Sequence, residues 1–222
     1  MLNFRKIITY SPFFSLLILF LLLGFASLYL FGKTDTFLFL NGLRVTWLNY
    51  FFILCTFLGD GIFVVLLGLF IIFYFKKKQL GIQVIISYAV SGIIAQLIKD
   101  KINAPRPASV FNNGEIYYFV EGLELAKQYG FPSGHTTSAF ALATTIILVT
   151  RTKKYQVPLF FFACIIGFSR IYLAQHFLID VLCGAMLGTI CSILIYWLLL
   201  GNKGRKDIWA SIKGQSEIQS GL

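Results

Sequence analysis

The chain has 222 residues, of which 58% are hydrophobic and only 13% are charged. This balance is typical of an integral membrane protein and excludes an ordinary soluble domain. The formal net charge of +10 would suit a nucleic-acid-binding protein, but the basic residues are distributed as in a membrane protein, and we expect no nucleic-acid partner.

Six apolar stretches are long enough to be membrane spans. A bilayer core about 30 Å thick needs roughly 20 apolar residues per helix. We therefore predict an all-α fold, a six-transmembrane helix bundle with an interfacial helix and a periplasmic loop or cap. Residues 1–201 would form one domain and residues 202–222 a short cytoplasmic tail. The expected spans lie at about 12–31, 57–75, 80–98, 134–150, 157–175 and 177–200.

Three further features of the sequence predict details of the structure. Residues 32–56 mix polar and aromatic side chains, which favours a helix at the membrane interface. Asp60, at the start of the second span, either pairs with a cation or complements the helix dipole. Gly184 and Gly188 predict close helix packing within the bundle of a monomer.

Residues 100–132 form the one long loop between the expected spans, and a loop of this length in a small protein is usually functional. We expect a cap over the active site that meets the substrate headgroup. The alternative is a surface connector.

The charge distribution predicts the orientation in the membrane. With a cytoplasmic N-terminus, twelve Lys and Arg residues and two acidic residues fall inside, whereas seven of each sign fall outside. Short basic loops stay in the cytoplasm. We therefore expect both termini in the cytoplasm and the 100–132 loop in the periplasm. The short chain, the minimal loops and the absence of an N-x-S/T sequon favour a protein of the bacterial inner membrane.

Three cations are candidate phosphate ligands. Lys99 precedes Arg106 by seven positions, and Arg170 follows later in the chain. A guanidinium can bind two phosphate oxygens at once, whereas an ammonium acts as a point charge. Isolated cations also snorkel at membrane interfaces, but we favour phosphate binding for all three.

The segment Pro132-Ser133-Gly134-His135 has the pattern of a helix start. Ser133 is a good N-cap, although its hydroxyl could instead donate to phosphate, and Gly134 permits close approach to free backbone N–H groups. His135 is the candidate general acid, since the pKa of histidine can be tuned to physiological pH.

His176 and Asp180 are four residues apart and so share one face of a helix. Asp180 could hold one ring nitrogen protonated while the other attacks phosphorus. A structural His–Asp pair is the alternative. The two histidines of the chain are 41 positions apart without an accompanying carboxylate cluster, so we expect no metal site.

Together these elements resemble the tripartite signature of the type 2 phosphatidic acid phosphatase superfamily, which also includes bacterial acid phosphatases and vanadium haloperoxidases. No position of the pattern is missing between residues 99 and 180. The resemblance implies a metal-free site without cofactors and a phosphohistidine intermediate. The matched positions are Lys99, Arg106, Pro107, Pro132, Ser133, Gly134, His135, Ser169, Arg170, His176 and Asp180.

We therefore predict a lipid phosphatase that hydrolyses a phosphomonoester or pyrophosphate headgroup at the periplasmic face. Substrates implied by the resemblance are undecaprenyl pyrophosphate, phosphatidylglycerol phosphate, phosphatidic acid and lipid A phosphates. Two alternatives are a phosphotransferase that passes the phosphate to an acceptor lipid, and a lipid-phosphate binder or transporter without chemistry.

Overall fold

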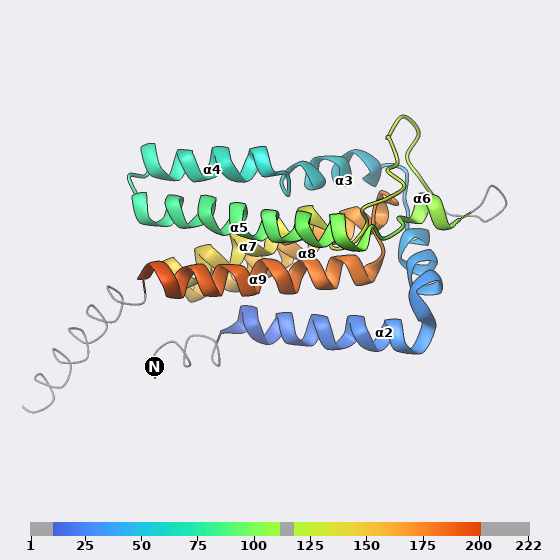
Figure 1. Cartoon of the computed structure of the whole chain (residues 1–222), viewed down its shortest axis with the longest axis horizontal. Coiled ribbons are helices and arrows are strands. Elements are labelled where there is room, and N and C mark those ends of the chain that lie inside the picture. The colour runs from blue at the N-terminus through green and yellow to red at the C-terminus, as the bar shows by residue number, and fades with distance from the viewer. Residues whose placement is uncertain (1–10, 112–117, 201–222) are drawn as a thin grey trace, which may run out of the picture.

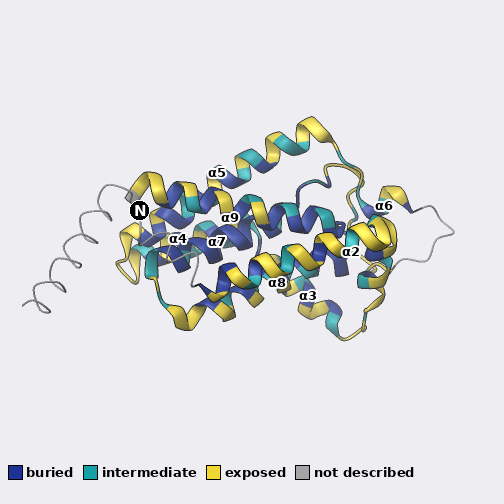
Figure 2. Ribbon diagram, turned by 90° about the horizontal axis from the view of Figure 1, so that it is seen from below, coloured by how far each residue is buried: buried dark blue, intermediate teal, exposed yellow. Residues whose placement is uncertain are grey.

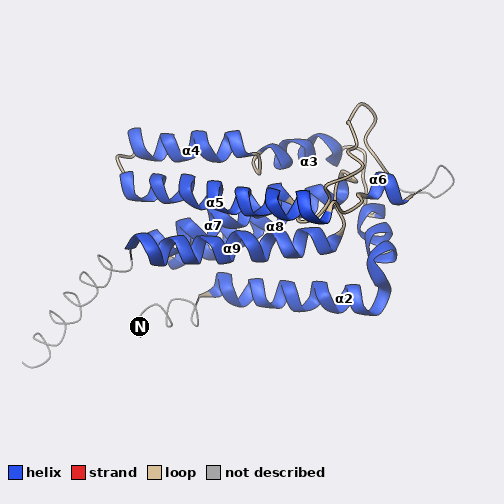
Figure 3. Cartoon of the chain, in the orientation of Figure 1, coloured by secondary structure: helices blue, strands red, loops and turns tan. Residues whose placement is uncertain are grey.

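The computed structural model describes residues 11–111 and 118–200, and all regular elements within them are helical (Figure 3). The predicted all-α fold is confirmed for this part of the chain. The expected tail at 202–222 and the middle of the expected cap, 112–117, lie outside the described residues. The helices are α2 (Pro12–Gly42), α3 (Leu48–Phe57), α4 (Gly61–Phe73), α5 (Lys78–Ile102), α6 (Pro107–Val110), α7 (Gly134–Thr150), the 3₁₀ turn η1 (Lys153–Tyr155), α8 (Gln156–Tyr172) and α9 (Leu178–Leu200).

The long helices lie side by side around α7 (Figure 1). Helix α7 packs against α5, α8 and α9, and its residues from Ala139 to Ala143 are at most 2% exposed. Figure 2 shows the contrast between this buried helix and the exposed faces of the outer ones. The buried residues of α7 include threonines as well as apolar side chains, so the neighbouring helices enclose it on every side. The bundle is thus organised around the helix that carries Ser133 and His135 at its start.

Helix α2 changes direction at Gly32. This glycine has a φ of 79°, a left-handed conformation that costs glycine little. Residues 12–31 run along the bundle, and the segment after Gly32 turns across its end (Figure 1). The sequence prediction placed one interfacial helix at 32–56. The structure instead has two helical pieces there, the end of α2 and α3, joined by residues 43–47.

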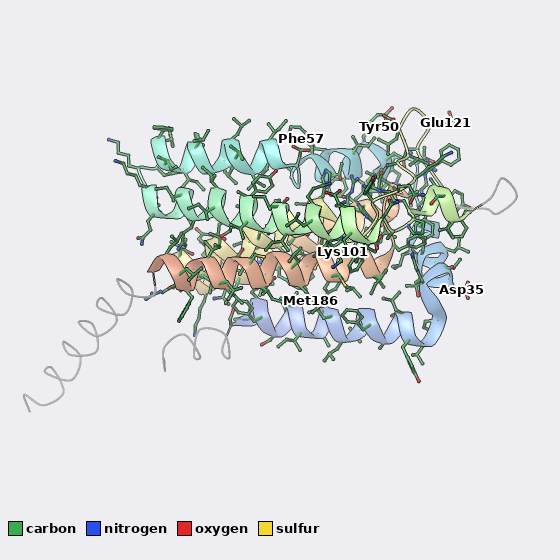
Figure 4. All side chains as sticks on the ribbon, in the orientation of Figure 1. Asp35, Tyr50, Phe57, Lys101, Glu121 and Met186 are labelled. Carbon is green, nitrogen blue, oxygen red and sulfur yellow. The ribbon has the colours of Figure 1, made fainter. Side chains whose placement is uncertain are left out.

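Within the described residues, four helices are long and apolar enough to cross a membrane, and the bent pair α3 and α4, at 59° to each other, would make a fifth. Helix α7 has 17 residues, which is about 26 Å at 1.5 Å per residue and shorter than a typical bilayer core. The chain is a multi-pass membrane protein, and the count of six spans stays a prediction. The loops collect at the end of the bundle where Asp35 and Glu121 lie (Figure 4). The start of α2 and the end of α9 lie at the other end (Figure 1).

Close packing of α7 and α9 depends on two glycines, as their spacing predicted. A Cβ atom at Gly184 would lie 2.7 Å from the carbonyl oxygen of Ser133, and one at Gly188 would lie 2.2 Å from that of Thr137. Backbone atoms cannot move aside without separating the helices. The two glycines therefore allow the start of α7 to pack directly against α9 of the same chain.

We expect Gly188→Ala to destabilise the folded protein by about 1–3 kcal/mol, the usual effect of overpacking a core. The measurement is the thermal unfolding midpoint in detergent. Gly92→Ala is the matched control, because a Cβ atom at Gly92 meets nothing within 4 Å. Equal thermal unfolding midpoints for the two variants would show that α7 and α9 can separate at little cost in stability.

Candidate active site

The three predicted sequence elements meet at the end of the bundle where the loops collect. Lys99 is in the last turn of α5, and Arg106 immediately precedes α6. Ser133 is the N-cap of α7, Arg170 is in the last turn of α8, and Asp180 is in the first turn of α9. The backbone N–H of Ser133 donates to the carbonyl of Asp180 at 2.9 Å, which joins the second element to the third.

His176 and Asp180 form a buried pair. Nδ1 of His176 lies 3.5 Å from Oδ2 of Asp180, and the two residues are 1% and 2% exposed. The same carboxylate oxygen accepts a hydrogen bond of 2.9 Å from the backbone N–H of Phe177, which fixes its position. Nδ1 has no hydrogen-bond partner among the described residues, so Asp180 is its nearest acceptor. Contacts of this kind often tighten when substrate binds.

The surroundings of His176 favour a neutral ring. Burial is the largest effect that lowers the pKa of His176 well below its usual value, followed by the positive charges of Arg170, Arg106 and Lys99. A hydrogen bond with the backbone of Gly130 acts in the opposite direction. A neutral imidazole keeps a free lone pair, which a nucleophile needs.

The start of α7 has the geometry of an anion-binding helix terminus. Ser133 is fully buried, and its Oγ accepts hydrogen bonds from the backbone N–H of Thr136 at 3.4 Å and from its hydroxyl at 2.8 Å. The predicted N-cap is therefore confirmed. A Cβ atom at Gly134 would meet nothing within 4 Å, so there is space in front of the helix start. Free N–H groups at such an end attract anions.

Lys99 and Arg106 are tied to the loop that ends at Pro132. Nζ of Lys99 donates to the carbonyl of Tyr129 at 3.0 Å. The guanidinium of Arg106 donates to the carbonyls of Gln128 at 2.9 Å and of Tyr129 at 3.3 Å. Both cations thus bind the same short stretch of backbone. This stretch holds them side by side and leaves further N–H donors for a ligand.

Arg170 is 8% exposed and is held by a residue outside the predicted signature. Its Nη1 donates to the hydroxyl of Thr56, in the last turn of α3. Its Nε is buried and has no hydrogen-bond partner among the described residues. Buried polar groups are normally paired, so an unpaired guanidinium N–H is available to an anion.

Two residues that the sequence did not single out organise the site. Gln175 accepts a hydrogen bond of 3.1 Å from Nη1 of Arg106 and donates to the carbonyl of Glu124 at 3.0 Å. Asn41 is fully buried, and its amide donates to the carbonyls of Tyr118 at 3.0 Å and Tyr172 at 3.1 Å. The sequence could have indicated Gln175, because it is a polar residue directly before His176. No local pattern marked Asn41.

The structure confirms one of the two interpretations of Asp60, the helix cap. Its Oδ1 accepts a hydrogen bond of 2.8 Å from the N–H of Ile62, so it caps α4. Its Oδ2 also lies 3.9 Å from Nε2 of His135. The carboxylate therefore both complements a helix start and faces the candidate general acid.

Comparison with known proteins gives the family. Residues 80–203, more than half of the chain, match the PAP2 superfamily. Lipid A 4′-phosphatase of Porphyromonas gingivalis is 28% identical over 178 residues, which are 78% of this chain and 75% of that protein. The crystal structure of Aquifex aeolicus LpxE superposes with a TM-score of 0.65 at 29% identity, over 73% of this chain and 93% of that one.

A second crystal structure shares the fold. The PAP2-type phosphatidylglycerolphosphate phosphatase of Bacillus subtilis has a TM-score of 0.61 at 24% identity, over 83% of this chain and 94% of that one. The chain belongs to the PAP2 superfamily, as the three sequence elements predicted, and it is a phosphatase.

We expect Gln175→Met to raise KM roughly 10-fold with little change in kcat, because a hydrogen bond to a charged group contributes about 1.5–3 kcal/mol. Methionine keeps the length of the side chain but cannot bind Arg106. Steady-state kinetics separates the two constants. Gln79→Met, exposed at the far end of α5, is the control. An unchanged KM for Gln175→Met would mean that Arg106 binds the substrate equally well without its hydrogen bond to Gln175.

Proposed function

We propose that the protein hydrolyses the phosphate or pyrophosphate headgroup of a membrane lipid through a phosphohistidine at His176. One observation carries the proposal. The buried His176–Asp180 pair, the start of α7 and the three cations Lys99, Arg106 and Arg170 lie at the same end of the bundle. A site that only bound phosphate would need the cations but not the histidine pair.

In the first step, the free ring nitrogen of His176 attacks phosphorus. The bond between phosphorus and the lipid oxygen breaks, and His135 donates its proton to that oxygen. The three cations and the N–H groups at the start of α7 stabilise the charge on the phosphoryl oxygens. Asp180 stays anionic and stabilises the proton on the other nitrogen of His176.

In the second step, water attacks the phosphohistidine. The neutral His135 accepts a proton from the water, and the P–N bond breaks with return of the electron pair to His176. Inorganic phosphate leaves, and both histidines regain their starting states. The charge balance uses side chains of this chain alone, so we expect turnover to survive EDTA.

The lipid character of the substrate is supported by a cavity next to the site. A cavity of about 600 Å³ lies between α2, α8 and α9 and is lined by Phe20, Leu23, Phe31, Phe168, Leu178 and Val181 among others. Its volume is in the range of small-molecule sites. Beside the catalytic turn, Nζ of Lys33 lies 3.9 Å from the centre of the Phe177 ring. We infer that an acyl or prenyl chain enters the cavity, beside the catalytic turn.

We propose further that six spans cross the inner membrane and that the site faces the periplasm, as the charge distribution predicts. Residues 118–130 would then cap the site from outside and meet the headgroup. An impermeant thiol reagent should label a cysteine at Glu121, but not one at Lys77, in intact cells. Labelling of both cysteine variants, or of Lys77→Cys alone, would contradict this orientation.

The function is tested by phosphate release from four purified lipids, in EDTA. These are undecaprenyl pyrophosphate, phosphatidylglycerol phosphate, phosphatidic acid and a lipid A phosphate. We expect release from at least one, with no gain from an added acceptor alcohol. Transfer of phosphate to the alcohol would identify a phosphotransferase. Loss of turnover in EDTA, restored by one divalent ion, would show that a metal takes part.

A further inference from the structure

The end of α3 and the break that joins it to α4, residues 58–60, contact the active site at two points, and both precede the residues that match the PAP2 superfamily. Thr56 binds Arg170, and Asp60 lies 3.9 Å from His135. Residues 58–60 continue α3 as turns, with backbone hydrogen bonds from Leu58, Gly59 and Asp60 to the carbonyls three residues earlier. The last turn of α3 therefore reaches an anion ligand, and the ordered break that follows it reaches the candidate acid.

Gly59 allows this close approach. A Cβ atom there would lie 2.6 Å from Cγ2 of Ile166 in α8 and 3.1 Å from the carbonyl oxygen of His135. The backbone of the break thus packs directly on α8 and on the first turn of α7. Capping of α4 then fixes the Asp60 carboxylate, because the N–H of Ile62 holds Oδ1 and leaves Oδ2 toward His135.

The tripartite signature contains no carboxylate that would stabilise a proton on His135, because its one carboxylate, Asp180, pairs with His176. Burial of the ring, followed by the positive charges of Arg170 from α8, Lys99 from α5 and Arg106 from the loop, disfavours a proton on His135. A general acid must nevertheless carry a proton when the leaving oxygen departs. An adjacent carboxylate stabilises the protonated ring. Asp60 is the carboxylate that contacts it.

We propose that Asp60 is a positioning residue for the general acid, which keeps His135 protonated and oriented while the cations hold the phosphate. Asp60 remains anionic throughout, and the proton that reaches the lipid oxygen comes from His135. The inference rests on the proposed acid role of His135. Asp60 acts on that role from a segment outside the matched family region.

The direct test follows the proton on His135 without any need for activity. The chain has two histidines, so the His176→Ala protein has one. It is purified through a histidine-free affinity tag, labelled with ¹⁵N-histidine and titrated by NMR in detergent. Asp60→Asn should lower the titration midpoint of His135 by roughly 0.2–0.7 pH unit, the range that corresponds to a partly exposed ion pair.

Two variants serve as controls for this titration. Asparagine is as good an N-cap as aspartate, so the fold of α4 is retained in Asp60→Asn. Asp60→Glu keeps the charge and should keep the midpoint closer to that of the parent protein. Glu121→Gln removes an exposed carboxylate of the loop and should leave it unchanged. The same midpoint with and without the Asp60→Asn substitution would overturn the inference.

A kinetic test follows in the protein with both histidines. At pH 7, Asp60→Asn should slow hydrolysis of an alkyl phosphate lipid about 10-fold, and that of p-nitrophenyl phosphate less than about 3-fold, since a good leaving group needs less acid catalysis. Added to His135→Ala, Asp60→Asn should cause no further loss, because the two act as a unit. Additive losses, or equal losses on both substrates, would contradict the role. Full activity of His135→Ala would instead refute the acid role of His135.

Discussion

His176→Ala is expected to reduce lipid phosphate hydrolysis by on the order of 10⁴-fold or more, as loss of a nucleophile does in other covalent mechanisms. No other ring nitrogen can replace it, because the second histidine of the chain contacts Asp60 rather than Asp180. Initial rates of phosphate release at saturating lipid provide the measurement. Asp180→Asn keeps the shape of the pair but disturbs its charge and tautomer, so its rate should lie between those of the wild type and His176→Ala.

A fold defect would also lower the rate of His176→Ala, since the ring is 1% exposed. Binding of orthovanadate or phosphate to the variant separates the explanations, because the three cations and the start of α7 remain. We expect binding to persist within about 10-fold of wild type. A rate for His176→Ala within a factor of ten of wild type would rule out His176 as the nucleophile.

His135→Ala is expected to slow hydrolysis by about 10²–10⁴-fold for a lipid with an alkyl leaving group. The same variant should lose much less with p-nitrophenyl phosphate, whose leaving group departs without a proton. The ratio of the two losses is therefore the diagnostic quantity, and a purely structural effect would leave this ratio at one. The side chain of His135 is 30% exposed, so its removal should leave the core intact.

The sequence predicted the helical class, the family and the set of residues that meets at one end of the bundle. These predictions succeeded because short motifs and apolar runs are local. The bend at Gly32 and the division of 32–56 into two helical pieces were missed, since a glycine inside an apolar run does not reveal its φ angle. The composition of α7 is that of a membrane span, but its 17 residues are fewer than the roughly 20 that a bilayer core needs.

The contacts that complete the site join distant parts of the chain. Thr56 and Arg170 are 114 positions apart, and Asn41 binds Tyr118 across 77. No periodicity or motif predicts such pairs. For Asp60 the sequence allowed two interpretations. The structure confirms the helix cap through Oδ1 and places Oδ2 3.9 Å from His135, which is a cation only when it is protonated.

Trapping of the covalent phosphoenzyme tests the central claim most directly. The wild-type protein and the two histidine variants are mixed with ³²P-labelled lipid, quenched rapidly at alkaline pH, where phosphohistidine survives, and mapped by peptide analysis. We predict label on His176 in the wild type and none in His176→Ala. His135→Ala should still form phosphohistidine on an activated substrate. Label in His176→Ala together with its absence in His135→Ala would reverse the assignment, and absence of label from all three proteins would contradict a covalent mechanism.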